Sequence, residues 1–252
     1  MTDDDIRGVD FHCHLDLYPD FPANIQESER AGIATLAVTT TPKAYLRNEE
    51  LCRSTVHVRA ALGLHPQLVA QRADELGLFE KLLPRTRYVG EIGLDAGRQH
   101  YGSFTQQTEV FTVILQLCAR AGGKILSIHS IRSASQVLNL VEKHLPSERG
   151  RVVLHWFSGN ASELRRAVEL GCYFSVNTAM LSTPSGQATI SAIPLDRLLT
   201  ETDGPFVQIG GKVARPVDTV SLASALAEKL DHDPDRLRTQ LVLNLQRLRA
   251  VP

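Results

Sequence analysis

Six side chains that are able to bind a divalent metal lie at or just past the C-terminal ends of short apolar segments. They are His12, His14, Glu91, His129, His155 and Asp203. The segments that precede them have the length and composition of β-strands, and they span 6–11, 88–92, 124–128, 151–154 and 197–200. If the ends of these strands meet in the fold, ligands from distant parts of the sequence converge on one metal site.

His12 and His14 form the closest pair within this set. In an extended strand, residues two positions apart share a face, so both imidazoles point to one side while Cys13 points to the other. A His-x-His pair alone is weak support for a metal site, and it gains weight only from the four ligands at equivalent strand ends. Four other histidines are interpreted as ordinary core or surface residues: His57, His100, His144 and His232.

The strand-like segments belong to a longer series of eight. They span 6–12, 33–41, 56–64, 87–93, 124–129, 151–156, 171–177 and 197–202. Between them, amphipathic segments such as 102–121 and 131–145 carry apolar residues at helical spacing. Eight strand–helix alternations in 252 residues predict an α/β fold of the (β/α)8 TIM-barrel type, whose strands end at one catalytic face. A doubly wound open sheet is the main alternative, but it gives no reason for these strand ends to meet.

Length and composition predict a single barrel domain over residues 1–252. The chain is 43% hydrophobic and 22% charged, a balance that allows one sizeable core. No apolar run approaches the roughly 18 residues that span a bilayer. Residues 1–5 are acidic where a signal peptide would be basic. We therefore expect a cytoplasmic protein without a membrane partner. Residues 233–249, which begin with Asp233 and Pro234, predict a closing helix.

Cysteine spacing and net charge exclude several classes of protein. The four cysteines are scattered without Cys-x-x-Cys spacing, so they predict reduced thiols rather than a zinc ribbon or a disulfide framework. The formal net charge is −1, so the chain lacks the global basic field that holds proteins along duplex nucleic acid. Any contact with nucleic acid must therefore be local, and single strands or ends are expected more than a duplex groove.

Six short motifs contain the candidate ligands and their strand ends. They are Phe11-His12-Cys13-His14-Leu15-Asp16, Gly63-Leu64-His65-Pro66, Gly90-Glu91-Ile92-Gly93-Leu94-Asp95, Ile128-His129-Ser130, Leu154-His155-Trp156-Phe157-Ser158-Gly159 and Leu199-Thr200-Glu201-Thr202-Asp203-Gly204-Pro205. In this order they resemble the motifs of the TatD-type metal-dependent deoxyribonucleases, over residues 8–248. The resemblance implies an amidohydrolase-like TIM barrel that hydrolyses DNA phosphodiester bonds with divalent cations, often as a 3′-to-5′ exonuclease.

Three segments, 10–20, 155–156 and 201–206, are most similar to the QatD branch of that family. This branch is associated with a multi-gene anti-phage defence system. The resemblance therefore implies a role in antiviral defence, with other proteins of the defence system as partners.

Carried over residue by residue, the resemblance implies two divalent cations. His12, His14, Glu91 and Asp203 would bind one, and Glu91, His129 and His155 would bind the other. Two cations roughly 3.5–4 Å apart suit in-line hydrolysis of a phosphodiester. Asp203 would then orient or deprotonate the attacking water. Zn²⁺, Mn²⁺ and Mg²⁺ all suit these ligands, so the sequence does not name the ion.

Further polar and aromatic residues flank the strand ends. His65, Arg132 and Glu201 are candidates for contacts with phosphate or with the ligands, and Glu201 is also a candidate catalytic carboxylate. Trp156 and Phe206 are candidates for stacking on an unpaired base. Each also has an ordinary interpretation, such as a surface ion pair for Arg132 or plain packing for Trp156.

Two other functions stay open at this point. The same barrel could act as a small-molecule amidohydrolase or phosphoesterase, or as a partner-dependent subunit of a defence complex. The fourth strand offers Glu91 and no nearby lysine to carbamylate, which favours a nuclease-type centre. The intact ligand set argues against a barrel that has lost its catalytic function.

Overall fold

The computed structural model describes residues 6–250 and contains a closed barrel of eight parallel strands. The acidic opening, residues 1–5, and residues 251–252 lie outside the described residues. The barrel strands are β1 Gly8–Cys13, β2 Ile33–Val38, β3 Val58–Ala61, β4 Tyr88–Asp95, β5 Lys124–Ile131, β6 Gly150–His155, β7 Tyr173–Val176 and β8 Leu198–Thr200. Each lies within or close to a predicted segment, so the predicted α/β barrel is confirmed.

Closure of the barrel excludes the doubly wound open sheet. The strands pair in parallel in the orders β1-β2-β3 and β4-β5-β6-β7-β8. The two groups join at one seam where Leu62 N donates to Tyr88 O (3.0 Å) and Gly90 N donates to Leu62 O (2.9 Å). At the other seam, Asp203 N donates to His12 O at 2.9 Å. The ends of all eight strands therefore surround one opening.

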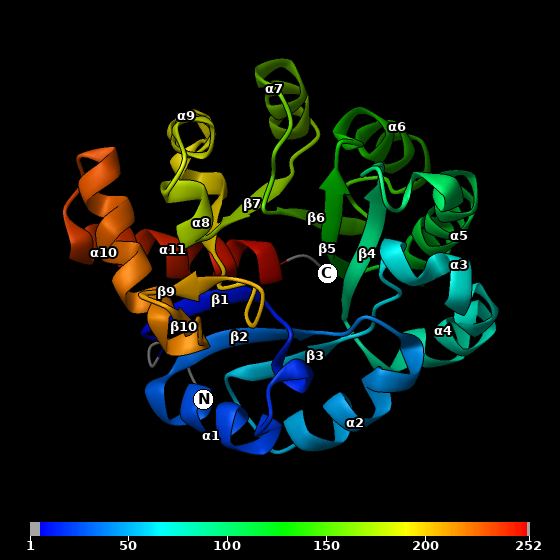
Figure 1. Cartoon of the computed structure of the whole chain (residues 1–252), viewed down its shortest axis with the longest axis horizontal. Coiled ribbons are helices and arrows are strands. Elements are labelled where there is room, and N and C mark those ends of the chain that lie inside the picture. Colours follow the sequence, from blue (N-terminus) through cyan, green and yellow to red (C-terminus); the bar gives the residue numbers. More distant parts are fainter. Residues whose placement is uncertain (1–5, 251–252) are drawn as a thin grey trace.

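Helices surround the strands (Figure 1). They are α1 Phe21–Ala31, α2 Pro42–Cys52, α3 Val69–Arg72, α4 Leu76–Leu82, α5 Phe104–Ala121, α6 Ala134–His144, α7 Ala161–Glu169, α8 Thr178–Leu181, α9 Pro184–Ala192, α10 Thr219–Leu230 and α11 Pro234–Arg249. A short hairpin, β9 Gln208–Ile209 and β10 Lys212–Val213, follows β8. The region predicted as helical over 102–121 begins with a single 3-10 turn, and the helix over 131–145 starts late because β5 extends to Ile131. Among residues 6–250, no helix combines the length and apolar character needed to cross a bilayer.

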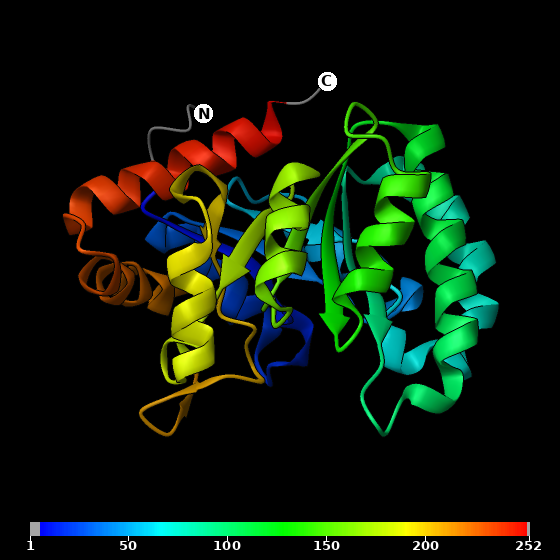
Figure 2. The same cartoon turned by 90° about the horizontal axis from the view of Figure 1, so that it is seen from above.

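The predicted closing helix is confirmed as α11, with the Asp233 side chain accepting a hydrogen bond from Arg236 N at its start. Figure 2 shows α11 along the side of the barrel opposite to the strand arrowheads. Its Leu245 and Leu248 pack against an apolar cluster drawn from all eight strands, which includes Val9, Phe11 and Leu199. Only the barrel interior brings eight strands together, so this cluster fills the N-terminal half and leaves the other end for polar groups.

In two strands, the alternation of inward-facing and outward-facing side chains shifts by one residue just before the predicted ligands. Val9 and Phe11 face the interior cluster, whereas Cys13 packs outside it. Odd-numbered residues therefore point inward up to Phe11, and even-numbered residues point inward from His12. The pairing of β1 with β2 is irregular over the same stretch, between Asp10 and Cys13. β4 has a matching irregularity between Val89 and Ile92. Such bulges re-aim side chains, and here they turn His12, His14 and Glu91 into the opening.

Candidate metal centre

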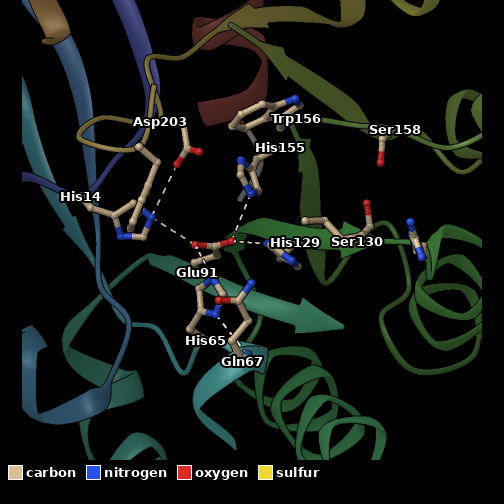
Figure 3. A pocket seen from close by; sticks show the side chains of 13 residues that line it. His14, His65, Gln67, Glu91, His129, Ser130, His155, Trp156, Ser158 and Asp203 are labelled. Atoms are coloured by element: carbon tan, nitrogen blue, oxygen red, sulfur yellow. Dashed lines mark hydrogen bonds and ion pairs between the residues drawn. The ribbon is translucent and has the colours of Figure 1, made fainter. Parts of the chain in front are cut away.

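The Glu91 carboxylate lies at the centre of a cluster of histidines, buried with an exposed fraction of 1% (Figure 3). Its Oε2 atom lies 3.3 Å from His12 Nε2 and 3.2 Å from His14 Nε2. Its Oε1 atom lies 2.6 Å from His129 Nδ1 and 3.1 Å from His155 Nε2. The two oxygens of one carboxylate therefore face two different groups of imidazoles.

The spacing of these donor atoms fits cation binding. His12 Nε2 and His14 Nε2 lie 3.3 Å apart, and Asp203 Oδ1 lies 3.8 and 3.7 Å from them. Ligands that bind one Zn²⁺ or Mn²⁺ at about 2.0–2.2 Å lie roughly 3.0–3.5 Å from one another. Two imidazole nitrogens that meet around a carboxylate oxygen at this distance are a donor set that suits a divalent ion.

Three of the four histidines predicted as ligands are held from behind by a second polar group. His12 Nδ1 lies 2.7 Å from Ser127 Oγ, and His129 Nε2 lies 3.1 Å from Asp95 Oδ2. His155 Nδ1 lies 3.4 Å from Glu201 Oε1. The carboxylates of Asp95 and Glu201 accept from the outer ring nitrogens of His129 and His155, and the Ser127 hydroxyl is able to accept from His12 in the same way. With its proton on the outer nitrogen, an imidazole has its inner nitrogen free to bind a cation. His14 differs, because its buried Nδ1 has no partner within the described part of the chain.

His65 also reaches Glu91, but its ring is arranged as a hydrogen-bond donor. Its Nδ1 accepts a hydrogen bond from the backbone N–H of Gln67 at 3.1 Å. The proton must then be on Nε2, which lies 3.1 Å from Glu91 Oε2. Although His65 could be grouped with Glu91 and His129 as a cation ligand by distance, this tautomer makes it a donor to an oxygen.

Glu201 stands behind His155 instead of facing the opening. Its side chain is fully buried and accepts hydrogen bonds from Ser175 Oγ and from Asn177 Nδ2, the latter at 2.9 Å. It is not among the described residues that line the cavity. Glu201 therefore contacts the candidate ligand His155, in keeping with its predicted place beside the ligands, and its role as a catalytic carboxylate stays a prediction.

Burial and charge together set the ionisation of this cluster. Burial opposes the charge of Glu91, but the imidazoles of His65, His155 and His12 outweigh it and hold the Glu91 pKa well below its usual range. Burial also opposes a charge on His155, but the carboxylates of Glu201 and Glu91 raise its pKa well above the ordinary value. Burial and the neighbouring His155 lower the pKa of His12. Glu91 is thus an anion surrounded by imidazoles.

Asp203 lies just beyond β8 at the edge of the cluster, with a left-handed backbone (φ 48°). Burial, together with the nearby carboxylates of Glu201 and Glu91, raises the pKa of Asp203 to about 7. Its carboxylate faces His12 and His14 and also lines the open cavity. Asp203 is therefore placed to contact both a cation and a molecule in the cavity.

The sequence that builds this cluster matches a known family of proteins. Residues 9–249 fit the model of the family described as TatD related DNase. The chain belongs to this family. As a member of the TatD-related family, it is a metal-dependent hydrolase.

Individual TatD-related relatives agree with this assignment. The chain is 29% identical to deoxyribonuclease Tat-D of Schizosaccharomyces pombe over 224 residues, which cover 82% of this chain and 70% of the relative. It is 28% identical to the 3'-5' ssDNA/RNA exonuclease TatD of Cronobacter sakazakii over 205 residues, which cover 76% and 74% of the two chains. The crystal structure of the TatD homologue YjjV of Escherichia coli superposes with a TM-score of 0.86 at 28% identity, covering 98% of this chain and 100% of the other.

The remaining predicted residues of this TatD-related site line the cavity in front of the cluster. The cavity has a volume of about 470 Å³, and Arg132, Trp156, His65 and Phe206 are among its lining residues. Arg132 (φ 51°) and Trp156 (φ 39°) both have left-handed backbones directly after the ends of β5 and β6. This conformation is unusual for non-glycine residues and concentrates at functional sites.

Sequence reasoning missed the groups that hold the ligands. Ser127 and Asp95 were not singled out, and neither was Asp10, which accepts hydrogen bonds from Thr202 N (2.9 Å) and Thr202 Oγ1 (2.6 Å) across the β1–β8 seam. A usable signal existed for Ser127, because it lies two residues before His129 on the same strand and so shares its face. Asp95 ends the Gly-Glu-Ile-Gly-Leu-Asp motif, but nothing in the sequence pairs it with His129.

Proposed function

We propose that the protein is a divalent-metal-dependent deoxyribonuclease that hydrolyses phosphodiester bonds at single-stranded DNA ends, in the 3′-to-5′ direction, by a two-metal mechanism. One observation carries the proposal: each oxygen of Glu91 faces its own group of imidazoles, at 3.2–3.3 Å on the Oε2 side and 2.6–3.1 Å on the Oε1 side. A bridging carboxylate of this kind suits two neighbouring cations. The Cronobacter relative, named a 3'-5' ssDNA/RNA exonuclease, supports the choice of single strands and of polarity.

The ligands divide between two divalent cations, with Glu91 common to both. His12, His14 and Asp203 would hold one, and His129 and His155 the other. Mg²⁺, Mn²⁺ and Zn²⁺ all suit this mixture of nitrogen and oxygen donors. Cations bound here would polarise a phosphate oxygen, lower the pKa of a nearby water and neutralise the leaving oxygen.

The chain's own groups would then orient the reactants. Asp203 faces both the cluster and the cavity, so it would accept the proton of the attacking water. His65 Nε2–H would donate to an oxygen at the centre, in keeping with its tautomer. Glu201 would act as a positioning residue that keeps the His155 ring aimed at Glu91.

Substrate contacts would come from the rim of the cavity. Arg132 is exposed and lines the cavity, so its guanidinium would pair with a backbone phosphate. Trp156 lines the same cavity and offers a ring to an unpaired base. A cavity of about 470 Å³ accommodates the end of one strand more readily than a duplex.

We further propose that the whole chain works as one domain in an antiviral defence system in the cytoplasm. The similarity of segments 10–20, 155–156 and 201–206 to the QatD branch supports this role. A plaque assay on cells that carry the complete gene set, with either wild type or Glu91→Gln, tests it. Equal plaque numbers for the two would remove the defence role.

The first experiment is a nuclease time course on end-labelled single-stranded and double-stranded DNA, with Mg²⁺, Mn²⁺, Zn²⁺ or EDTA. Wild type, Glu91→Gln and Asp203→Asn are compared, and circular dichroism shows that each variant folds. We expect metal-dependent release of nucleotides by wild type alone. If metal-loaded wild type cleaves small phosphodiesters or cyclic amides but no polymer, the small-molecule hydrolase replaces the nuclease. Cleavage only with added defence proteins would indicate the partner-dependent subunit.

A further inference from the structure

Two segments project beyond the strand ends on the same side of the barrel as the metal centre (Figure 2). One is the connection between β4 and α5, residues 96–103, and the other follows β8 and contains the β9–β10 hairpin. Each carries an aromatic side chain that is largely exposed to solvent: Tyr101 is 63% exposed, and Phe206 is 62% exposed. Phe206 lines the cavity whereas Tyr101 does not, so a ligand that contacts both rings must extend beyond the cavity.

Tyr101 forms half of a stacked pair. Its ring lies nearly parallel to that of Phe104, with an interplanar angle of 14° and 5.7 Å between centroids. Phe104 is half-buried at the start of α5 and packs against the apolar core, which fixes the position of the pair. Because Tyr101 stays 63% exposed despite this stacking, much of its ring is open to solvent. The pair is thus an aromatic platform on a fixed base.

Hydrogen bonds tie this platform to the metal centre. Asp95 Oδ1 accepts from Gly97 N at 2.7 Å, while Asp95 Oδ2 lies 3.1 Å from Nε2 of the ligand His129. Gln107 Oε1 accepts from Asp95 N at 2.8 Å, and Gln107 Nε2 donates to His100 O at 3.0 Å. The connection is therefore held by several hydrogen bonds, and Asp95 links it directly to His129.

The charges beside the two projecting rings suit a polyanion. Arg98 is exposed three residues before Tyr101, and Lys212 is exposed in the hairpin beyond Phe206. Neither makes an ion pair within residues 6–250, so both cations are available to a ligand. Exposed aromatic rings interleaved with unpaired cations are the recognition pattern of single-stranded nucleic acid, where bases stack and phosphates pair.

We propose that the Tyr101–Phe104 pair is a base-stacking subsite for an unpaired nucleotide that lies several nucleotides from the scissile phosphate, with Arg98 paired to the adjoining phosphate. This inference rests on the proposed function. Tyr101 is not among the cavity-lining residues described above, so the subsite lies outside the cavity, and we expect a dinucleotide held in the cavity not to contact it. A duplex does not fit as the occupant, because stacking between neighbouring base pairs already covers the base faces on which a ring would stack.

The test is a binding series without cleavage. Fluorescein-labelled oligothymidylates, from dinucleotide to dodecamer, are titrated with full-length protein in EDTA, and fluorescence anisotropy gives the dissociation constants. Tyr101→Ala should weaken dodecamer binding by about 5- to 100-fold. The loss of affinity should become smaller as the oligonucleotide becomes shorter, and it should vanish for the dinucleotide. Tyr101→Phe should retain the wild-type length dependence, and Leu243→Ala, which removes a partly exposed side chain on α11, serves as a matched surface control.

The outcomes separate this subsite from the proposed nuclease activity. If Tyr101→Ala binds every length as wild type does, the subsite is disproved, whatever the nuclease assay shows. An equal loss for the dinucleotide and the dodecamer also overturns it, because the variant would then have disturbed the centre. If binding shows the predicted length dependence but wild type cleaves no polymer with any metal, the subsite stands and the nuclease activity fails.

Discussion

The two sides of the Glu91 carboxylate are built differently. On the Oε1 side, His129 and His155 come from β5 and β6, whose pairing is regular, and each has a carboxylate behind it. On the Oε2 side, His12 lies in β1 and His14 directly follows it, where the pairing of β1 with β2 has become irregular. Only a hydroxyl stands behind His12, and within residues 6–250 nothing pairs with His14 Nδ1.

This contrast predicts unequal cation binding. A carboxylate behind an imidazole fixes the ring and makes the inner nitrogen a better donor, whereas a hydroxyl does so less strongly. We therefore expect the Oε1 side to bind its cation more tightly and the Oε2 side to exchange its cation more readily. The four substitutions below are ordered from the largest expected effect to the smallest.

Glu91→Gln should remove the negative charge of the carboxylate, which both sides of the centre share. The amide keeps the shape but not the charge that the surrounding imidazoles stabilise, so both cations should be lost. Activity should fall well beyond the 10- to 100-fold range typical of outer partners of a metal site. Metal analysis of the dialysed protein measures the stoichiometry. His129→Ala and His14→Ala serve as one-sided comparisons, each expected to lose one cation. A Glu91→Gln protein that retains one cation at wild-type affinity would contradict the bridging role.

Gly93→Ala should destabilise the Oε1 side by disturbing the backbone contact between β4 and β5. Gly93 has φ 135°, and an added Cβ would lie 2.1 Å from the carbonyl oxygen of His129. Relieving this clash separates β4 from β5 beside a ligand, so we expect a loss of about 3 kcal/mol, or roughly 6–12 °C in Tm.

Gly77→Ala on α4 is the control for this measurement, since an added Cβ there meets nothing within 4 Å. Alanine is the better helix former by about 0.5–1 kcal/mol, so Tm should hold or rise slightly. Differential scanning calorimetry compares the two variants. A Gly93→Ala protein as stable as Gly77→Ala would mean that the β4–β5 contact is not rigid.

The same comparison shows what the sequence could predict. Plain alternation along β5 and β6 places Ser127, His129 and His155 on the inner face, as period-two reasoning requires. Along β1, strict alternation from Phe11 would turn His12 outward. The His-x-His pattern correctly predicted that both imidazoles share a face, but the bulge that turns this face inward has no local sequence signature.

The outer partners were harder to predict than the ligands. Glu201 was singled out because it flanks a strand end, as a candidate for contacts with the ligands and for catalysis. The chain leaves extended geometry at Asp203, so the two carboxylates serve different neighbours. Asp95 lies 34 residues from His129 in the sequence, and only the pairing of β4 with β5 brings them together. The pairing of strands in the folded protein determines such contacts, and the local patterns of a single sequence do not predict which residues it brings together.

Asp95→Asn should weaken the Oε1 side selectively. The amide would present an N–H to His129 Nε2, which moves the ring proton to Nδ1, the atom that faces Glu91. A ring with that tautomer cannot bind a cation through Nδ1, so affinity on this side should fall about 10- to 100-fold. Isothermal titration with Mn²⁺ measures both sides. The exposed Asp74→Asn is the control. Equal weakening of both sites would contradict the assignment of Asp95 to one side.

Ser127→Ala should have the smallest effect of the series. The hydroxyl that holds His12 Nδ1 at 2.7 Å is neutral, and its hydrogen bond contributes about 0.5–1.5 kcal/mol. We expect a roughly two- to tenfold loss of affinity on the Oε2 side only, measured in the same Mn²⁺ titration, with the exposed Ser224→Ala as control. Asp95→Asn moves the ring proton of His129 to the other nitrogen, whereas Ser127→Ala only removes a hydrogen bond to His12. Asp95→Asn should therefore cause the larger loss of cation affinity. If Ser127→Ala costs as much, the two sides of Glu91 are held equally, and the expected difference in cation exchange disappears.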